Sequence, residues 1–185
     1  MGMSSWWWFL TRSTGIVAAA LAVTSLAWGF FFTSRTMGSR LRANWWLSLH
    51  KWLGGMTLSF VVAHMAVSWL DEDQALRLVD LVVPSGAVGW SIGYGVIAAW
   101  LFALVVLPSV ARIRRRLPRW LWRTVHLLAV PAVVLTGIHT ALAGTDITSQ
   151  VFILGFSLLV AFAVFTLTIR LLGLGSRSRR PPVAA

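Results

Sequence analysis

The sequence predicts an all-α membrane protein, a polytopic bundle of five transmembrane helices. Three observations predict this fold class. The 185-residue chain is 58% hydrophobic, with a mean hydropathy of +0.79 and only 11% charged residues, so it is too apolar for a water-soluble domain of this size. The apolar residues gather in long stretches, and most charged residues fall outside those stretches.

Five apolar stretches are each roughly 20 residues or longer, which is enough to cross a hydrocarbon core of about 30 Å. They lie near residues 6–32, 44–70, 86–110, 119–143 and 149–173. No segment outside them is large enough for a second folded domain. We therefore expect one membrane domain over residues 1–175, followed by a basic tail over residues 176–185.

The first stretch, residues 6–32, differs from a secretory signal peptide. A signal peptide has a basic segment, a short apolar run and a cleavage site after small residues. Here no basic residue precedes the apolar run, Arg12 lies within it, and no small-x-small site follows it. We interpret this stretch as the first transmembrane helix.

The charges between the stretches predict the orientation. Basic residues follow the first stretch, the third stretch and the fifth stretch: Arg35, Arg40, Arg42, Arg112, Arg114, Arg115, Arg116, Arg119, Arg177, Arg179 and Arg180. The other two connections hold every acidic residue: Asp71, Glu72, Asp73, Asp80 and Asp146. Because basic loops stay in the cytoplasm, we expect the N-terminus outside and the C-terminus inside a plasma membrane, of bacterial type.

The net charge of +11 does not indicate a nucleic-acid-binding protein. Membrane topology explains why the arginines gather on one side, and contact with anionic lipid headgroups adds to that preference. The chain has no cysteine, which excludes disulfides and thiolate metal ligands. The partner expected from charge alone is membrane lipid.

All four histidines fall inside predicted spans, two on each of two helices. His50 and His64 lie on the second helix, and His126 and His139 lie on the fourth. Both helices run from the inside to the outside, so His50 and His126 lie near the cytoplasmic ends. His64 and His139 lie farther out by about 21 Å and about 20 Å, because each residue of a helix rises about 1.5 Å. The histidines therefore form an inner pair and an outer pair.

Ionisable residues inside a membrane span mark functional sites. Two imidazoles at one depth suit the two axial positions of a haem, whereas zinc or copper needs more ligands at one depth. We expect His50 and His126 to hold an inner haem b, and His64 and His139 to hold an outer one. The alternative is a transporter in which the histidines bond hydroxyl groups or relay protons. The absence of a carboxylate in the spans argues against that alternative.

The helical phase of the fourth span presents a difficulty. A step of fourteen residues keeps His50 and His64 on one face, but a step of thirteen falls about 140° short of four turns. Pro131 lies between His126 and His139, and a proline kinks a helix and changes the phase of the residues after it. We expect a distortion near Pro131, with a twisted arrangement of the two haems as the alternative.

Two further residues are candidates for cofactor binding. Gly54 lies one turn beyond His50, where a glycine allows a flat macrocycle to approach the backbone; Gly55 and Gly137 invite the same interpretation, and helix packing explains all three equally well. Arg12 lies at the depth of the outer pair, where its charge suits a haem propionate or negative charge on an electron acceptor. Snorkelling to the outer interface is the alternative for Arg12.

These residues resemble those of the ferric reductase-like transmembrane family. That group includes NADPH oxidases, ferric-chelate reductases and the haem-binding subunit of the bacterial methionine sulfoxide reductase system. The histidine spacing on both spans matches the oxidases, and Arg12-Ser-Thr-Gly15 is similar to an Arg-x-x-Gly early in the family's core. The resemblance covers nearly the whole chain. It implies an oxidoreductase or electron-transfer subunit that passes electrons from the cytoplasmic side to the outside.

Two departures from the family shape the expected partners. About a dozen residues follow the fifth stretch and no GxGxxG loop is present, so we expect a cytoplasmic flavoprotein reductase or a quinol as the electron donor. Ser68 stands where the oxidases have a further histidine, which argues against superoxide production. The expected acceptor is a ferric chelate, oxygen, a quinone or an outer-side reductase. The alternative is a haem-binding anchor subunit without turnover of its own.

Overall fold

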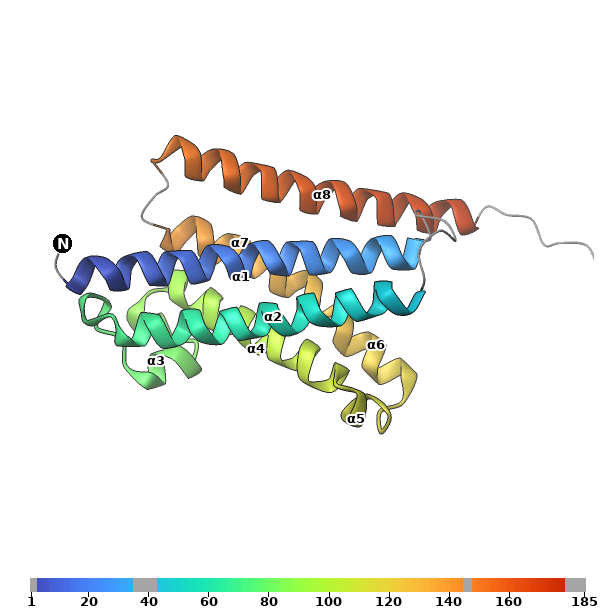
Figure 1. Cartoon of the computed structure of the whole chain (residues 1–185), viewed down its shortest axis with the longest axis horizontal. Helices are drawn as coiled ribbons and strands as arrows, with labels where there is room; N and C mark the ends of the chain where they lie inside the picture. The colour runs from blue at the N-terminus through green and yellow to red at the C-terminus, as the bar shows by residue number, and fades with distance from the viewer. Residues whose placement is uncertain (1–2, 35–42, 145–147, 179–185) are drawn as a thin grey trace, which may run out of the picture.

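The computed structural model describes residues 3–34, 43–144 and 148–178, and over these residues the chain is made of helices joined by turns. Figure 1 shows their arrangement. The elements are α1 Met3–Ser34, α2 Ala43–Leu70, η1 Glu72–Gln74, α3 Leu78–Val82, η2 Gly86–Val88, α4 Trp90–Val106, η3 Leu107–Ser109, α5 Ala111–Arg114, α6 Arg119–Leu127, α7 Ala129–Ala143 and α8 Gln150–Ser178.

Five segments are long and apolar enough to cross a membrane, which confirms the predicted bundle. They are Trp6–Phe32, Asn44–Leu70, Trp90–Ser109, Arg119–Ala143 and Gln150–Leu172. The third begins later than the predicted residue 86. Gly89 has a φ of 93° there, a conformation that glycine adopts readily, and it separates η2 from α4. Large hydrophobic side chains stay exposed along the spans, as expected for an integral membrane protein that faces lipid.

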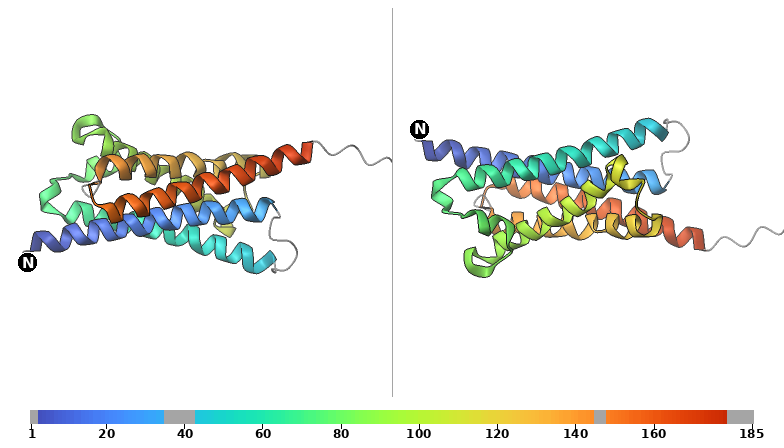
Figure 2. Two further views of the ribbon diagram at one scale, coloured as in Figure 1. Left: turned by 90° about the horizontal axis from the view of Figure 1, so that it is seen from above. Right: turned by 90° about the horizontal axis from the view of Figure 1, so that it is seen from below.

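The helices pack in neighbouring pairs along one long axis. α1 lies along α2 on one side and α8 on the other, and α4 packs along α7. Figure 2 shows α1, α2, α7 and α8 running along the same axis. The loop with η1 and α3 lies at the end where α1 begins, while α5 lies at the opposite end. The acidic loop and the basic α5 segment are therefore at opposite ends, as the charge pattern predicts.

The core lies where α1, α4 and α7 meet. Its buried residues are Ala22, Ala98, Phe102 and Ala132. The three alanines let the helix backbones approach closely, which is the common form of packing between membrane helices. Ala132 follows His126 by six residues and precedes His139 by seven. The core therefore lies between the levels of the inner and outer histidines.

The fourth span is broken between its two histidines, as the sequence predicts. α6 ends at Leu127 and α7 begins at Ala129. The Leu128 N–H bonds the Val125 carbonyl at 3.0 Å, a tight i to i−3 turn. Pro131 has no N–H to offer the Leu127 carbonyl, and its ring crowds that carbonyl. The proline thus explains a break three residues before itself.

The loop between α2 and α4 is folded. The Arg77 N–H donates to Asp80 Oδ2 at 3.0 Å, and the Arg77 side chain pairs with the same carboxylate at 3.1 Å. These Arg77 bonds hold the pKa of Asp80 below its ordinary value. Gln74 donates to the buried Asp71 at 2.8 Å. The loop therefore has its own polar framework at the end of the bundle.

Some sequence predictions lie outside the described residues. These are the arginines of the 35–42 connection, Asp146, and the tail from residue 179 onward; α8 continues to Ser178. Trp28 packs within the bundle. Its ring stacks on Trp46 at 4.0 Å, and its Nε1 donates to the Trp46 carbonyl at 3.1 Å.

Candidate functional site

The structure brings the four histidines together as two pairs. The His50 and His126 rings lie 5.8 Å apart between centroids, with planes at 75°. The His64 and His139 rings lie 6.1 Å apart, with planes at 71°. Both pairs join α2 to the α6–α7 span, at the two levels that the sequence predicts. The break at Leu128 lies between the two partners on the second span, and both of them still face α2.

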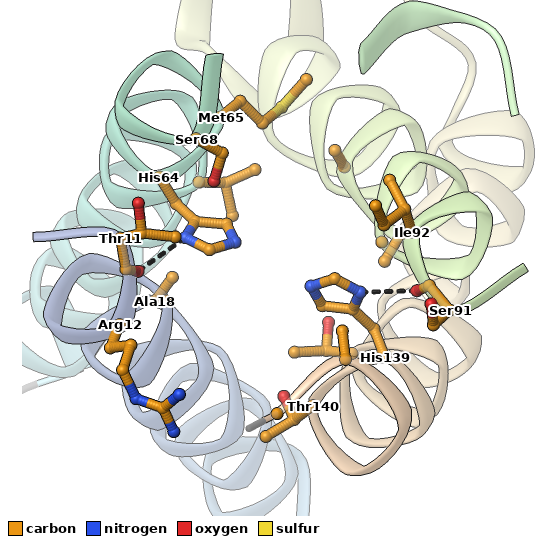
Figure 3. A pocket seen from close by; sticks show the side chains of 18 of the residues that line it. Thr11, Arg12, Ala18, His64, Met65, Ser68, Ser91, Ile92, His139 and Thr140 are labelled. Carbon is orange, nitrogen blue, oxygen red and sulfur yellow. Dashed lines mark hydrogen bonds between the residues drawn. The ribbon is translucent and has the colours of Figure 1, made fainter. Parts of the chain in front are cut away.

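Hydrogen bonds to backbone carbonyls fix both rings of the outer pair. His64 Nδ1 donates to the Thr11 carbonyl on α1 at 2.9 Å, and His139 Nδ1 donates to the Ser91 carbonyl on α4 at 2.7 Å. A carbonyl only accepts, so each Nδ1 carries a proton, and in the neutral ring each Nε2 then keeps a free lone pair. Figure 3 shows the two rings facing each other with these bonds behind them.

Glycines on neighbouring helices make room for three of the four rings. A Cβ on Gly95 would meet His139 Nδ1 at 2.8 Å, and one on Gly15 would meet His64 Cε1 at 3.0 Å. On the inner side a Cβ on Gly29 would meet His50 Cε1 at 3.3 Å. Any side chain at Gly95 therefore displaces a histidine, because real Cβ contacts are longer than 3.0 Å.

A cavity of about 550 Å³ adjoins the outer pair. Binding sites for small molecules and cofactors have volumes of this order. Its lining includes both outer histidines, Arg12, Met65 and the buried Ser68. It also reaches the outer loop at Asp71, Asp73 and Gln74. The outer pair thus faces a space that is continuous with the acidic end of the bundle.

The inner pair is held differently. His50 Nδ1 and His126 Nδ1 are buried and make no hydrogen bond with the described residues. The Ser25 backbone approaches His50 without a well-aligned bond. The His126 ring stacks on Trp122, with centroids 4.8 Å apart and planes at 19°. Packing against Trp122 rather than hydrogen bonding therefore orients the His126 ring.

The remaining predicted candidates occupy distinct places. Arg12 lies at the outer cavity, with its guanidinium over the Trp8 ring at 4.7 Å. A Cβ on Gly54 would meet Ser25 Oγ and Val106 Cγ2 at 4.0 Å, which is ordinary contact, and no histidine within that distance. Cβ atoms on Gly55 and Gly137 would meet nothing within 4 Å.

Sequence reasoning missed several of the residues that support the rings. Gly15 was noted only as part of the Arg-x-x-Gly stretch, and Gly29, Gly95 and Trp122 were not singled out for the site. Only Trp122 left a usable signal, because it precedes His126 by four residues and so shares its helical face. The glycines act across helix interfaces that no spacing along the chain reveals.

Among the described residues, no group of three or more His, Asp or Glu side chains is placed to hold a metal ion. Each level offers two imidazoles. The arrangement therefore suits a metal whose other ligands come with its own cofactor.

Comparison with known proteins identifies the family. Residues 3–137 match the family model described as ferric reductase like transmembrane component. This match spans α1 to most of α7 and ends two residues before His139. No curated protein and no solved structure matches the chain significantly. The fold, the membrane spans and the match agree: the chain is an integral membrane protein of the electron-transfer type and belongs to the ferric reductase-like transmembrane family.

Proposed function

We propose that this protein is a di-haem membrane cytochrome b that carries electrons from the cytoplasmic side to the outside. His50 and His126 would hold the inner haem, and His64 and His139 the outer one. The main observation in support is the geometry of the two histidine pairs, whose ring centroids are 5.8 and 6.1 Å apart. Two imidazoles that share one metal ion, each through a bond of about 2 Å, have centroids roughly 6 Å apart.

The protonation of the outer pair also supports the proposal. Metal-binding histidines usually donate their second ring N–H to a carbonyl or carboxylate, which fixes the ring and makes the ligand more basic. His64 and His139 both do so. Their Nε2 atoms, which face each other across the cavity, are then the two available metal ligands.

The chain contributes position and environment, while a haem would supply the one-electron redox chemistry. α2 sets the separation of the two sites, about 21 Å along its axis for fourteen residues. The apolar core of Ala22, Ala98, Phe102 and Ala132 lies between them. Arg12 at the outer cavity has the charge to bind a propionate. Gly54, one turn from His50, would give an inner macrocycle access to the α2 backbone.

The direction of transfer follows from the charge pattern. The basic α5 end is expected in the cytoplasm, so the donor, a flavoprotein reductase or a quinol, would reach the inner pair. The outer cavity extends to Asp71, Asp73 and Gln74 on the opposite end. An acceptor there, whether ferric chelate, oxygen, quinone or a reductase, would reach the outer pair.

An absorption spectrum with a haem count tests the proposal. The purified full-length protein should show a reduced-minus-oxidised spectrum of the b type and about two haems per chain. In vesicles that contain a ferric chelate, an external reductant should reduce that chelate only when the protein is present. A folded, colourless protein that moves protons or solutes without a redox donor would instead favour the transporter hypothesis. Two haems without electron transfer would favour the anchor subunit.

A further inference from the structure

One aromatic stack connects the basic end of the bundle to the inner histidine pair. The Trp122 ring lies parallel to the His126 ring, with centroids 4.8 Å apart. The Arg114 guanidinium lies over the same Trp122 ring, 4.4 Å from its centroid. The three side chains therefore form a layered arrangement of cation, indole and imidazole. A cation over an indole face is a favourable contact.

The stack is anchored from both sides. Trp122 Nε1 donates to Ser109 Oγ at 3.2 Å, and Ser109 Oγ in turn donates to the Val105 carbonyl at 2.7 Å. Arg114 donates to the Leu117 carbonyl at 3.4 Å. The indole is thus tied to η3, which follows α4, while the guanidinium is held on the α5 side. Trp122 has a fixed plane rather than the freedom of an interfacial tryptophan.

His126 needs such support more than the outer histidines do. Its Nδ1 is buried and makes no hydrogen bond with the described residues, whereas His64 and His139 each donate to a carbonyl. Without that bond a ring can rotate about its Cβ–Cγ axis. In this chain the parallel Trp122 face takes over the orienting task.

We propose that Trp122 is a positioning residue for His126, and that it places the Arg114 charge where it raises the reduction potential of the inner haem. This rests on the proposed function. A nearby positive charge stabilises the reduced form, which carries one positive charge less. Two steps of 4.4 and 4.8 Å separate the guanidinium carbon from the His126 ring. At that range the charge changes the inner redox equilibrium roughly three- to tenfold, depending on solvent screening.

Redox titration and EPR of the holoprotein test the inference. Nearly perpendicular imidazole planes, as in both pairs, give a strongly anisotropic low-spin signal that reports ring orientation. His139→Ala identifies the inner signal. Trp122→Leu should shift the inner signal and leave the outer one in place. Trp122→Phe, which keeps an aromatic face but not the Ser109 bond, should restore most of the wild-type signal.

Arg114→Gln separates the charge from the stack. This variant should keep two haems and the inner EPR signal. Its inner reduction potential should fall by the equivalent of a roughly three- to tenfold change in the redox equilibrium constant, where tenfold is 59 mV for one electron. This variant also tests the inference if Trp122→Leu does not fold. Matched controls are Trp120→Leu, an exposed tryptophan on the same helix, and Arg115→Gln, an exposed neighbouring charge.

The outcomes are distinct from those of the proposed function. A wild-type protein without haem would overturn both. Two haems with an inner signal unchanged in Trp122→Leu would overturn the positioning role alone. An inner potential in Arg114→Gln equal to that in Arg115→Gln would overturn the charge effect alone.

Discussion

The outer and inner histidine pairs have nearly the same spacing but different supports. The outer rings each donate a hydrogen bond to a backbone carbonyl, and glycines Gly15 and Gly95 lie directly against them. The inner rings make no such bond. His126 stacks on Trp122, and Gly29 lies less closely against His50 than the outer glycines lie against their rings. A hydrogen bond fixes direction and distance, while a packed face allows a ring to slide.

This difference has consequences for both chemistry and tolerance. Ligands that donate to a carbonyl are more basic, which favours the oxidised form of a bound metal. We therefore expect the outer haem to have the lower potential of the two. The step from the inner to the outer haem is then uphill, so the donor and the acceptor must supply the driving force for transfer. The outer site should also be the less tolerant of added volume, because its contacts are shorter.

Removal of a ligand is the largest change and tests the pairing itself. His64→Ala and His139→Ala should each eliminate the outer haem and leave the inner one, so that the haem count falls from about two to about one. His50→Ala and His126→Ala should do the reverse. The readout is a haem count with EPR of the remaining site. If either outer variant lost both haems in a folded protein, the assignment of pairs by depth would be wrong.

Added volume beside the rings should affect the outer site more than the inner one. Gly95→Ala places a Cβ 2.8 Å from His139 Nδ1, so the ring must move and its bond to Ser91 must weaken. Overpacking of this kind costs about 1–3 kcal/mol, so the outer haem affinity should fall by roughly 5- to 150-fold. Gly29→Ala, at 3.3 Å from His50, should weaken the inner site much less.

Haem titration of the apoprotein measures both affinities. Gly155→Ala on α8 is the matched control, because a Cβ there meets nothing within 4 Å. Equal losses in Gly95→Ala and Gly155→Ala would show that helix stability, and not the histidine contact, is responsible.

The helix break offers a milder way to separate the two pairs. Pro131→Ala supplies an N–H that can donate to the Leu127 carbonyl. It also removes the proline ring that crowds this carbonyl. A straighter span rotates α6 relative to α7, and the unbonded His126 should follow while the Ser91 bond retains His139. Occupancy of the inner site should then fall, while the outer haem stays in place. A loss confined to the outer haem would contradict the ranking of the two supports.

Much of the fold could be predicted from the sequence because a long run of apolar residues is enough to indicate a membrane span. The predicted span of residues 44–70 coincides with Asn44–Leu70, and the distortion near Pro131 was expected from helical phase and from the proline itself. The pairing of His50 with His126 followed from their depth. These are properties of single helices, which spacing along the chain encodes.

The supports of the site were not accessible because they act across helices. Gly95 touches His139 and Gly29 touches His50 only after α4 meets α7 and α1 meets α2. The sequence favoured Gly54 instead, since it lies one turn from His50 on the same helix. Interhelical rotation, which hydropathy does not fix, decides which glycine faces a ring.

The smallest predicted effect concerns the outer loop and its pH dependence. Arg77 lowers the pKa of Asp80 in the folded loop, so the stabilisation is present above the ordinary carboxyl pKa of about 4 and is lost as the pH falls below it. Asp80→Asn should remove this stabilisation at neutral pH as well. Exchange of the amides in residues 72–82 should become faster, while the haem count stays at about two.

Glu72→Gln is the matched control for that loop, because Glu72 is exposed, carries the same charge and does not line the outer cavity. The loop reaches the outer cavity through Asp71, Gln74 and Leu81, so a loosened loop should broaden the outer haem signal slightly and leave the inner signal unchanged. A stronger effect on the inner signal would contradict the view that this loop supports the outer site, since the loop and the Trp122 stack lie at opposite ends of the bundle. Equal exchange in Asp80→Asn and Glu72→Gln would show that net charge, rather than the Arg77 pair, holds the loop.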